Sequence, residues 1–214
     1  MEKSNKPDQL ITGILLAAGS SSRLGSPKQL LIWKNQYLIN FVINEILRSK
    51  INDLVVVLGE NGQKIKNVIK HKVKIIHNGN WIEGKSSSIK AGISLLNNET
   101  QGAMFFVVDQ PFININLINK LINEFNKTPD HIIVPCNKGR ICNPVLFPKK
   151  CFSELVLLSG DEGGKQIIKH TKHIKWNNFD DERLFLDIDT KADYEEILSD
   201  LSSFKSLNKD TDFL

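Results

Sequence analysis

The stretch of the chain that decides its fold is Ile14-Leu15-Leu16-Ala17-Ala18-Gly19-Ser20-Ser21-Ser22-Arg23-Leu24-Gly25-Ser26-Pro27-Lys28. It begins as an apolar run typical of a buried strand and continues as small, hydroxyl-bearing residues. Gly19 and Gly25 are expected to let the backbone turn where a Cβ would clash, and to let N–H groups approach an anion. Arg23 and Lys28 add full positive charges for a polyphosphate. The stretch predicts a phosphate-binding loop; the alternative is a Ser/Gly-rich surface loop with incidental charges.

The spacing of this stretch excludes two widespread phosphate-binding motifs. The P-loop pattern requires a shorter interval between its glycines and a lysine directly after the second one. Here five residues separate Gly19 from Gly25, and Ser26 follows. The dinucleotide-binding pattern G-x-G-x-x-G is also absent, because position 21 is serine.

The composition is that of an ordinary globular protein. The chain of 214 residues is long enough for one domain with a substantial core, and 41% of it is apolar and 24% charged. No apolar run has the length of a membrane span and the N-terminus lacks a signal-peptide pattern, so we expect a cytoplasmic protein with no membrane partner. The net charge of +4 is diffuse, which suits small anionic substrates and argues against nucleic acid. Cys136, Cys142 and Cys151 lack C-x-x-C spacing, so free thiols are expected.

Strands and helices are predicted to alternate along the chain. The expected strands are residues 11–17, 54–58, 73–77, 103–108, 131–135, 144–148, 173–176 and 184–189. The expected helices are residues 37–49, a segment from the 59–62 turn to about 71, and residues 88–97, 114–126, 150–158, 163–170 and 190–201. This alternation predicts an α/β fold, a single three-layer domain with a mostly parallel sheet and helices on both faces. We place the domain at residues 11–201, between polar tails at 1–10 and 202–214.

Asp109 is expected to bind a metal ion. Ligands of parallel sheets bind at the carboxyl ends of the strands, where Asp109 ends a buried one. A carboxylate is costly there unless it binds a cation or hydrogen-bond donors. Mg²⁺, or Mn²⁺ in its place, held by one or two carboxylates plus nucleotide phosphates is the usual arrangement. The competing interpretation is an N-cap for the helix that begins at Asn114.

The segment Asp187-Ile188-Asp189 offers further carboxylates. Strand alternation would send Asp187 and Asp189 to the same side, with Ile188 opposite. Separated aspartates holding one or two Mg²⁺ ions would neutralise a triphosphate and orient its α-phosphorus, so both join Asp109 as predicted metal ligands. Alternatively, Asp189 or Thr190 only caps the last helix.

Two further glycine-containing loops precede predicted helices. Gly84-Lys85-Ser86-Ser87-Ser88 places hydroxyl and N–H groups at a helix N-terminus, which suits an anion or a nucleobase edge; an ordinary serine cap is the alternative. Asn78 and Trp81 could line the same pocket, or Trp81 could belong to the core. Gly160-Asp161-Glu162-Gly163-Gly164-Lys165 suits the phosphate of a second substrate, with a plain turn as its alternative.

The ordered set of motifs resembles the molybdenum cofactor cytidylyltransferases within the MobA-like NTP transferase family, over about residues 11–200. The motifs are Leu16-Ala17-Ala18-Gly19-x-Ser21-x-Arg23-x-Gly25-x-x-Lys28, Asn78…Gly84-x-x-x-Ser88, Asp109-Gln110-Pro111, Asn143-Pro144-Val145-Leu146-Phe147, Gly160-Asp161-x-Gly163 and Asp187-x-Asp189-Thr190. The resemblance implies a Rossmann-like nucleotidyltransferase fold, Mg²⁺, and transfer of CMP from CTP to the terminal phosphate of molybdopterin-bound molybdenum with release of pyrophosphate. A recipient molybdoenzyme is a further partner that it implies.

With the chemistry above, the resemblance assigns a role to each site residue. Arg23, Lys28 and Asp109 are expected to be catalytic. The expected nucleotide-binding residues are Leu16, Ala17, Ala18, Gly19, Ser21, Arg23, Gly25, Lys28, Gly84, Ser88 and Asp109. The expected metal ligands are Asp109, Asp189 and Asp187, and the expected acceptor-binding residues are Asn143, Pro144, Gly160, Asp161, Gly163 and Lys165.

Three positions bear on the choice of substrates. Ala18 favours CTP, since guanylyl-transferring relatives tend to carry glycine there. Cys142-Asn143 stands where many members have Gly-His, and Lys165 stands where arginine is common. Both departures lie in segments expected to bind the acceptor, so two alternatives for the function stay open. One is an NTP transferase acting on another phosphorylated acceptor, such as a sugar or polyol phosphate, and the other is a non-catalytic carrier of the molybdenum cofactor.

Overall fold

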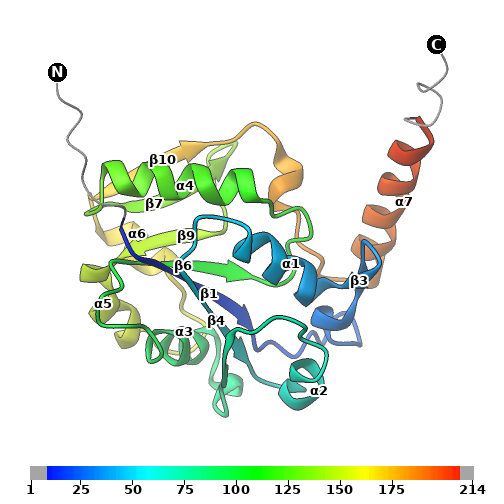
Figure 1. Ribbon diagram of the computed structural model, residues 1–214, viewed down its shortest axis with the longest axis horizontal. Coiled ribbons are helices and arrows are strands. Elements are labelled where there is room, and N and C mark those ends of the chain that lie inside the picture. The colour runs from blue at the N-terminus through cyan, green and yellow to red at the C-terminus, as the bar shows by residue number, and fades with distance from the viewer. Residues whose placement is uncertain (1–8, 208–214) are drawn as a thin grey trace.

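The structure is a computed structural model that describes residues 9–207 (Figure 1). The strands of its main sheet are β1 (Ile11–Ala17), β4 (Asp53–Leu58), β5 (Lys74–His77), β6 (Gly102–Val107), β7 (Ile132–Asn137), β8 (Arg140–Ile141), β9 (Val145–Pro148) and β10 (Ile174–Asn178). Within the described range they form an eight-stranded sheet in the order β10-β7-β9-β6-β1-β4-β5, with β8 beside β7. A small separate hairpin joins β2 (Ile32–Trp33) to β3 (Gln36–Tyr37).

Most of the sheet is parallel, as predicted. β1 pairs in parallel with β4 on one side and β6 on the other, β4 with β5, and β7 with β10. β9 runs antiparallel to both β6 and β7, and β8 is antiparallel to β7. The central position of β1 explains its nearly continuous apolar sequence, because a strand with neighbours on both edges and helices on both faces is buried all round. The carboxyl ends of β1, β4, β5 and β6 therefore meet at one edge.

Helices cover both faces of the sheet and make the domain three-layered (Figure 1). They are α1 (Leu38–Leu47), α2 (Gly62–Lys66), α3 (Lys85–Ile93), α4 (Ile115–Lys127), α5 (Phe152–Leu157), α6 (Lys165–His170) and α7 (Lys191–Leu207). One apolar core contains Ile43 of α1 and Leu121 of α4, and the other contains Ile89 of α3, Leu155 of α5 and Ile168 of α6. Within residues 9–207, no helix combines the length and the apolar character that crossing a membrane requires.

The strand expected at residues 184–189 is wrong. Residues Glu182–Phe185 form a 3₁₀ helix, η4, and an irregular segment follows. Leu184 and Phe185 pack partly against the core, and the fully buried Ile188 donates its N–H to the carbonyl oxygen of Asp109 at 2.9 Å. One backbone hydrogen bond anchors the segment beside β6 without continuing into a ladder, so strand alternation does not apply to the aspartates on either side.

Other element bounds differ from the prediction by a few residues. α2 ends at Lys66 and only turns follow, whereas the helix was expected to continue to about residue 71. α3 begins at Lys85 rather than at Ser88. α7 continues to Leu207, beyond the expected end at residue 201 and into the predicted tail; residues 1–8 and 208–214 lie outside the described range. The three cysteines are free, as expected.

Candidate active site

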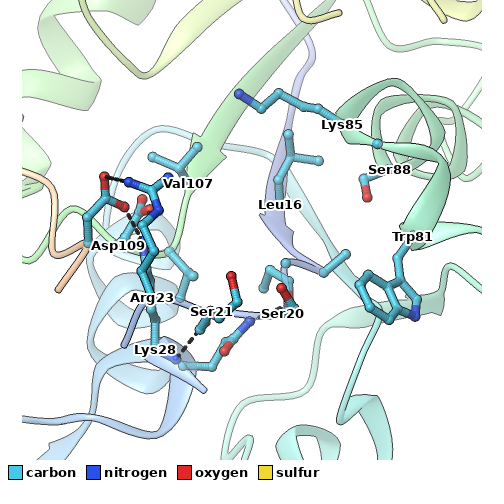
Figure 2. Close-up of a pocket in the computed structure, with 18 of the residues that line it drawn as sticks. Leu16, Ser20, Ser21, Arg23, Lys28, Trp81, Lys85, Ser88, Val107 and Asp109 are labelled. Carbon is cyan, nitrogen blue, oxygen red and sulfur yellow. Dashed lines mark hydrogen bonds and ion pairs between the residues drawn. The ribbon is translucent and has the colours of Figure 1, made fainter. Parts of the chain in front are cut away.

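A cavity of about 440 Å³, here called cavity A, lies at the carboxyl ends of β1 and β6 (Figure 2). Its lining includes most of the residues predicted to bind nucleotide or metal: Leu16, Ala17, Ala18, Gly19, Ser21, Arg23, Lys28, Gly84, Ser88, Asp109 and Asp189. Gly25 is not part of the lining. Cavity A therefore brings together residues from four widely separated stretches of sequence, as expected for the carboxyl edge of a parallel sheet.

The loop after β1 is held in shape by its own backbone. Ser21 adopts a left-handed conformation with φ 56°, and its carbonyl oxygen accepts hydrogen bonds from the N–H groups of Leu24 (3.0 Å) and Gly25 (3.2 Å). Its Oγ accepts a further bond from the Lys28 N–H at 3.0 Å. Gly25, at φ 75°, needs the conformational freedom that was predicted for it. These contacts fix the two cations of the loop at the mouth of cavity A.

Only the turn predicted for Gly19 is wrong. Its φ lies outside the left-handed region, and a Cβ built on it meets no atom within 4 Å. Neither the turn nor the protein packing requires glycine here. Because Gly19 lines cavity A, the missing side chain leaves open space in the cavity, which a ligand can approach down to the backbone.

A four-residue charge network, made of Arg23, Lys28, Asp109 and Asp189, stands at one side of cavity A. The Lys28 Nζ donates to Asp109 Oδ2 at 3.0 Å and to Asp189 Oδ1 at 2.5 Å, and the lysine side chain is only 13% exposed. Arg23, which is 75% exposed, reaches Asp189 Oδ2 at 3.4 Å. Burial opposes the charge of Lys28, yet its bonds to both carboxylates raise its pKa, and the same contact lowers the pKa of Asp189.

Neither aspartate has the capping role considered for it, whereas Thr190, the other candidate for the last helix, does cap α7. The side chain of Asn114 caps α4, accepting from the Leu117 N–H at 3.0 Å, so Asp109 is not needed there. At α7, Thr190 and Asp193 cap reciprocally: Asp193 Oδ2 accepts from the Thr190 N–H at 2.8 Å and Thr190 Oγ1 from the Asp193 N–H at 3.2 Å. Asp109 and Asp189 are thereby left to face cavity A.

The wall of cavity A opposite the charge network comes from α3 and the turn before it (Figure 2). Gly84 is the N-cap of α3 and no side chain caps this end, so the serine-cap alternative is wrong. The buried Asn78 donates to Ser87 Oγ (2.8 Å) and Ser88 Oγ (3.0 Å) and orders both hydroxyls. Asn78 supports the wall from behind, whereas Trp81 lines the cavity while packing partly on the core.

Sequence reasoning missed several residues that line cavity A, among them Gln29 and Lys85. Gln29 is 1% exposed and donates its Nε2 to the Ala17 carbonyl oxygen at 2.7 Å, but a glutamine after a predicted loop carries no functional signal. Lys85 also lines the cavity. A signal for it was present, since this cation stands directly after Gly84 within the second glycine-containing loop.

Gly84 provides a test of how the two glycine-containing loops fit together. Its φ is 102°, and a Cβ there would lie 2.5 Å from the backbone carbon and oxygen of Gly160. Gly84→Ala is expected to destabilise the fold by about 2 kcal/mol, because both backbone strain and the clash must be relieved. Urea unfolding measures this loss. Gly79→Ala is the matched control, since nothing lies within 4 Å of a Cβ at that position; equal stability of the two variants would contradict the prediction.

A second cavity of about 420 Å³, cavity B, is lined by most of the residues predicted to bind the acceptor. Asn143, Asp161, Gly163 and Lys165 line it. Pro144 and Gly160 do not: Pro144 lies beside the lining residue Asn143, and Gly160 supports α3 by accepting the Ser86 N–H at 3.1 Å. Nine of the lining residues are large and apolar: Leu16, Ile89, Phe105, Val107, Ile141, Val145, Phe147, Leu155 and Ile168.

Asp187 and Asp189 line different cavities, contrary to the expectation that they share one side. Asp189 lines cavity A and Asp187 lines cavity B, because the irregular segment between them turns around the buried Ile188. Desolvation and the neighbouring charge of Asp109 raise the pKa of Asp187 to about 6, against a hydrogen bond from Gln110. Asp189 is thus the aspartate that joins Asp109 at the charge network.

The charge network fits a divalent cation together with a nucleotide. No group of three or more His, Cys, Asp or Glu side chains with metal-site geometry occurs within residues 9–207. Asp109 and Asp189 nevertheless converge on one positive charge, the Lys28 ammonium. Mg²⁺ is commonly held by one or two carboxylates, with substrate phosphates and water completing its shell. A pair of carboxylates beside two cations for phosphates matches that donor set.

Comparison with known proteins agrees with this geometry. The family model of the MobA-like NTP transferase domain matches residues 13–175. The chain belongs to the MobA-like NTP transferase family. The matched range includes the loop after β1, the start of α3 and Asp109, while Asp189 follows it. This MobA-like chain is therefore a nucleotidyltransferase.

Two curated relatives of this MobA-like protein are named as molybdenum cofactor nucleotidyltransferases. It is 25% identical over 183 residues to the molybdenum cofactor cytidylyltransferase of Escherichia coli K12, covering 85% of this chain and 92% of the relative. It is 26% identical over 200 residues to a probable molybdenum cofactor guanylyltransferase of Bacillus cytotoxicus, covering 88% and 96%. The solved structure of Rv0371c from Mycobacterium tuberculosis H37Rv shares the fold at 24% identity, with a TM-score of 0.80 over 90% of this chain and 100% of that one. Rv0371c has also been solved in complex with manganese.

Proposed function

We propose that this protein transfers CMP from CTP to the terminal phosphate of the molybdenum cofactor and releases pyrophosphate. The observation that carries the proposal is the contact between the two cavities. Cavity A holds the charge network suited to a metal–triphosphate, and cavity B shares part of its wall. A donor in one cavity and an acceptor in the other would meet at their boundary, which supplies the proximity that group transfer needs.

The lining of cavity B supports an acceptor with both a ring system and a phosphate. Its apolar side chains suit the faces of a planar, partly apolar group. Lys165 and Lys169 supply positive charge for a phosphate at the same cavity. The cytidylyltransferase name of the E. coli relative and the presence of Ala18 in the lining of cavity A support CTP as donor.

The residues of cavity A then have separate tasks. Lys28 and Arg23 bind the β- and γ-phosphates and stabilise the charge of the departing pyrophosphate. Asp109 and Asp189 would hold Mg²⁺, which supplies charge neutralisation on the triphosphate. Ser88, whose hydroxyl oxygen accepts from Asn78, keeps its own proton to donate to the nucleotide. No side-chain nucleophile is required, because a phosphate monoester is already ionised near neutral pH.

The proposal is tested by incubating the protein with each NTP, Mg²⁺ or Mn²⁺, and either molybdenum cofactor or a panel of sugar and polyol phosphates. Pyrophosphate release and the mass of the product are followed. We expect turnover with CTP and molybdenum cofactor, and none after addition of EDTA. Turnover with a sugar or polyol phosphate, and none with the molybdenum cofactor, would show that the acceptor is that phosphate. Tight binding of the cofactor without pyrophosphate from any NTP would instead indicate a carrier.

A further inference from the structure

Four residues line both cavities and so define their boundary: Leu16, Lys85, Val107 and Asp161. Leu16 belongs to β1 and Val107 to β6, two paired strands at the centre of the sheet, so the floor of the boundary is rigid and apolar. Lys85 and Asp161 are the charged members. Of these two, only Lys85 has the sign that attracts a phosphate.

Lys85 differs from the other cations of the site by its position. Within residues 9–207, each of the other lysines and arginines that line a cavity lines only one of the two. Arg23 and Lys28 line cavity A, and Lys165 and Lys169 line cavity B. Lys85 is the first residue of α3 and lines both. Figure 2 shows its side chain extending from α3 over Leu16 towards Val107, across cavity A from Lys28.

The Lys85 ammonium has no partner in the described part of the chain. It makes no hydrogen bond and no ion pair within residues 9–207, whereas the Lys28 ammonium is bonded to two carboxylates. Its stem lies close to Gly163, since a Cβ there would lie 3.3 Å from Lys85 Cδ. The charges of Lys28 and Arg23 are matched by Asp109 and Asp189, whereas Lys85 contributes a boundary cation that no carboxylate contacts within residues 9–207.

The proposed reaction needs a cation at this boundary. An oxygen of the acceptor phosphate forms a bond to the α-phosphorus of CTP, and the bond from that phosphorus to the oxygen bridging to the β-phosphate breaks. The bridging oxygen leaves with the electron pair as part of pyrophosphate. Two anionic groups must approach each other where the cavities meet, and an ammonium group there lowers their repulsion.

We propose that the Lys85 ammonium contacts both the α-phosphate of the nucleotide and the attacking acceptor phosphate, and that Lys85 is a further catalytic residue. This inference rests on the proposed function. The cations then have two different tasks. Lys28 and Arg23 stabilise the leaving pyrophosphate, and Lys85 reduces the repulsion between the two phosphates that become joined. The interaction strengthens as the two phosphates approach, so its loss affects turnover more than nucleotide binding.

The test compares Lys85→Met and Lys85→Arg with Lys90→Met. Lys90 lies on the same helix and is exposed, but it lines neither cavity. We expect kcat to fall about 100-fold in Lys85→Met, while the affinity for nucleotide falls no more than about 10-fold. Lys85→Arg should recover part of the loss, and Lys90→Met should match the wild type. Wild-type kcat in Lys85→Met overturns the assignment. So does an equal loss in Lys90→Met, or a loss explained by a lowered melting temperature of the free protein.

A binding measurement separates this inference from the proposed function. Absence of transfer to any acceptor by the wild type contradicts the proposed function. Lys85 is then judged by the affinity for the monophosphate of whichever NTP raises the melting temperature. That monophosphate carries only the α-phosphate, so its affinity is expected to fall about 10-fold in Lys85→Met and to stay unchanged in Lys90→Met. An unchanged affinity, or a wild type that binds no nucleotide, overturns the role of Lys85.

Discussion

Replacement of Lys28 by methionine is expected to lower kcat by at least about 10³-fold, the size of effect that a phosphate-stabilising cation produces in other phosphoryl-type transfers. Lys28 is the most buried cation of the charge network and bonds to Asp109 at 3.0 Å and Asp189 at 2.5 Å. Its loss removes the charge that stabilises the departing pyrophosphate. Initial rates of pyrophosphate release with saturating nucleotide measure the effect.

Binding of metal separates this prediction from simple misfolding. In Lys28→Met, two carboxylates face each other without their ammonium, so Mn²⁺ alone should bind more tightly than to the wild type, as followed by calorimetry. Lys64→Met serves as control, because Lys64 is exposed on α2 and lines neither cavity. Near-normal turnover in Lys28→Met, or a similar loss in Lys64→Met, would rule out the assigned role.

Asp109→Asn is the second substitution with a large expected effect, again about 10³-fold or more in kcat. The amide preserves the shape of the side chain but removes the charge that Lys28 and a divalent cation share. Folding should be retained, because Lys28 keeps Asp189 as partner and the Asp109 carbonyl oxygen still accepts from Ile188. The measurement combines turnover with Mn²⁺ affinity in the presence of nucleotide, both of which should fall.

Asp53→Asn is the matched control for Asp109. Asp53 also forms an ion pair with a lysine, Lys74, but it stands at the first residue of β4, at the opposite edge of the sheet. Its replacement should leave turnover and Mn²⁺ affinity within about 2-fold, since exposed ion pairs contribute little. Retention of metal affinity in Asp109→Asn would place the metal elsewhere and would contradict the assignment of Asp109.

The predictions that succeeded depend on residues close together in sequence. The turn of the loop after β1 at Gly25 was correct, because Ser21, Gly25 and Lys28 are linked by hydrogen bonds within one short stretch. The position of Asp109 followed from the parallel sheet, since every strand of that kind ends at the same edge. The alternating pattern of apolar segments was enough for both inferences.

The predictions that failed depend on contacts between distant segments. Asp187 and Asp189 were assigned to one side because residues 184–189 read as a strand, but that segment has no strand to pair with and is held by the carbonyl oxygen of Asp109. Lys85 was overlooked because its position is significant only beside cavity B, most of whose lining lies at residues 141–169, far from Lys85 in the sequence. Gly19 was given a turn that its φ does not require. None of these contacts leaves a periodic trace in the sequence.

The shared wall of Leu16 and Val107 has a consequence for the fate of the product. Under the proposed reaction, the substrates enter as two separate molecules and leave as one molecule with a part in each cavity. When one part of the product detaches from its cavity, the part still bound in the other cavity keeps the detached part at a high effective concentration nearby. Rebinding of the detached part therefore competes with escape of the whole product. Release of the joined product is then slower than release of either substrate and can limit the overall rate. Under the proposed reaction, the protein therefore holds its product longer than it holds either substrate.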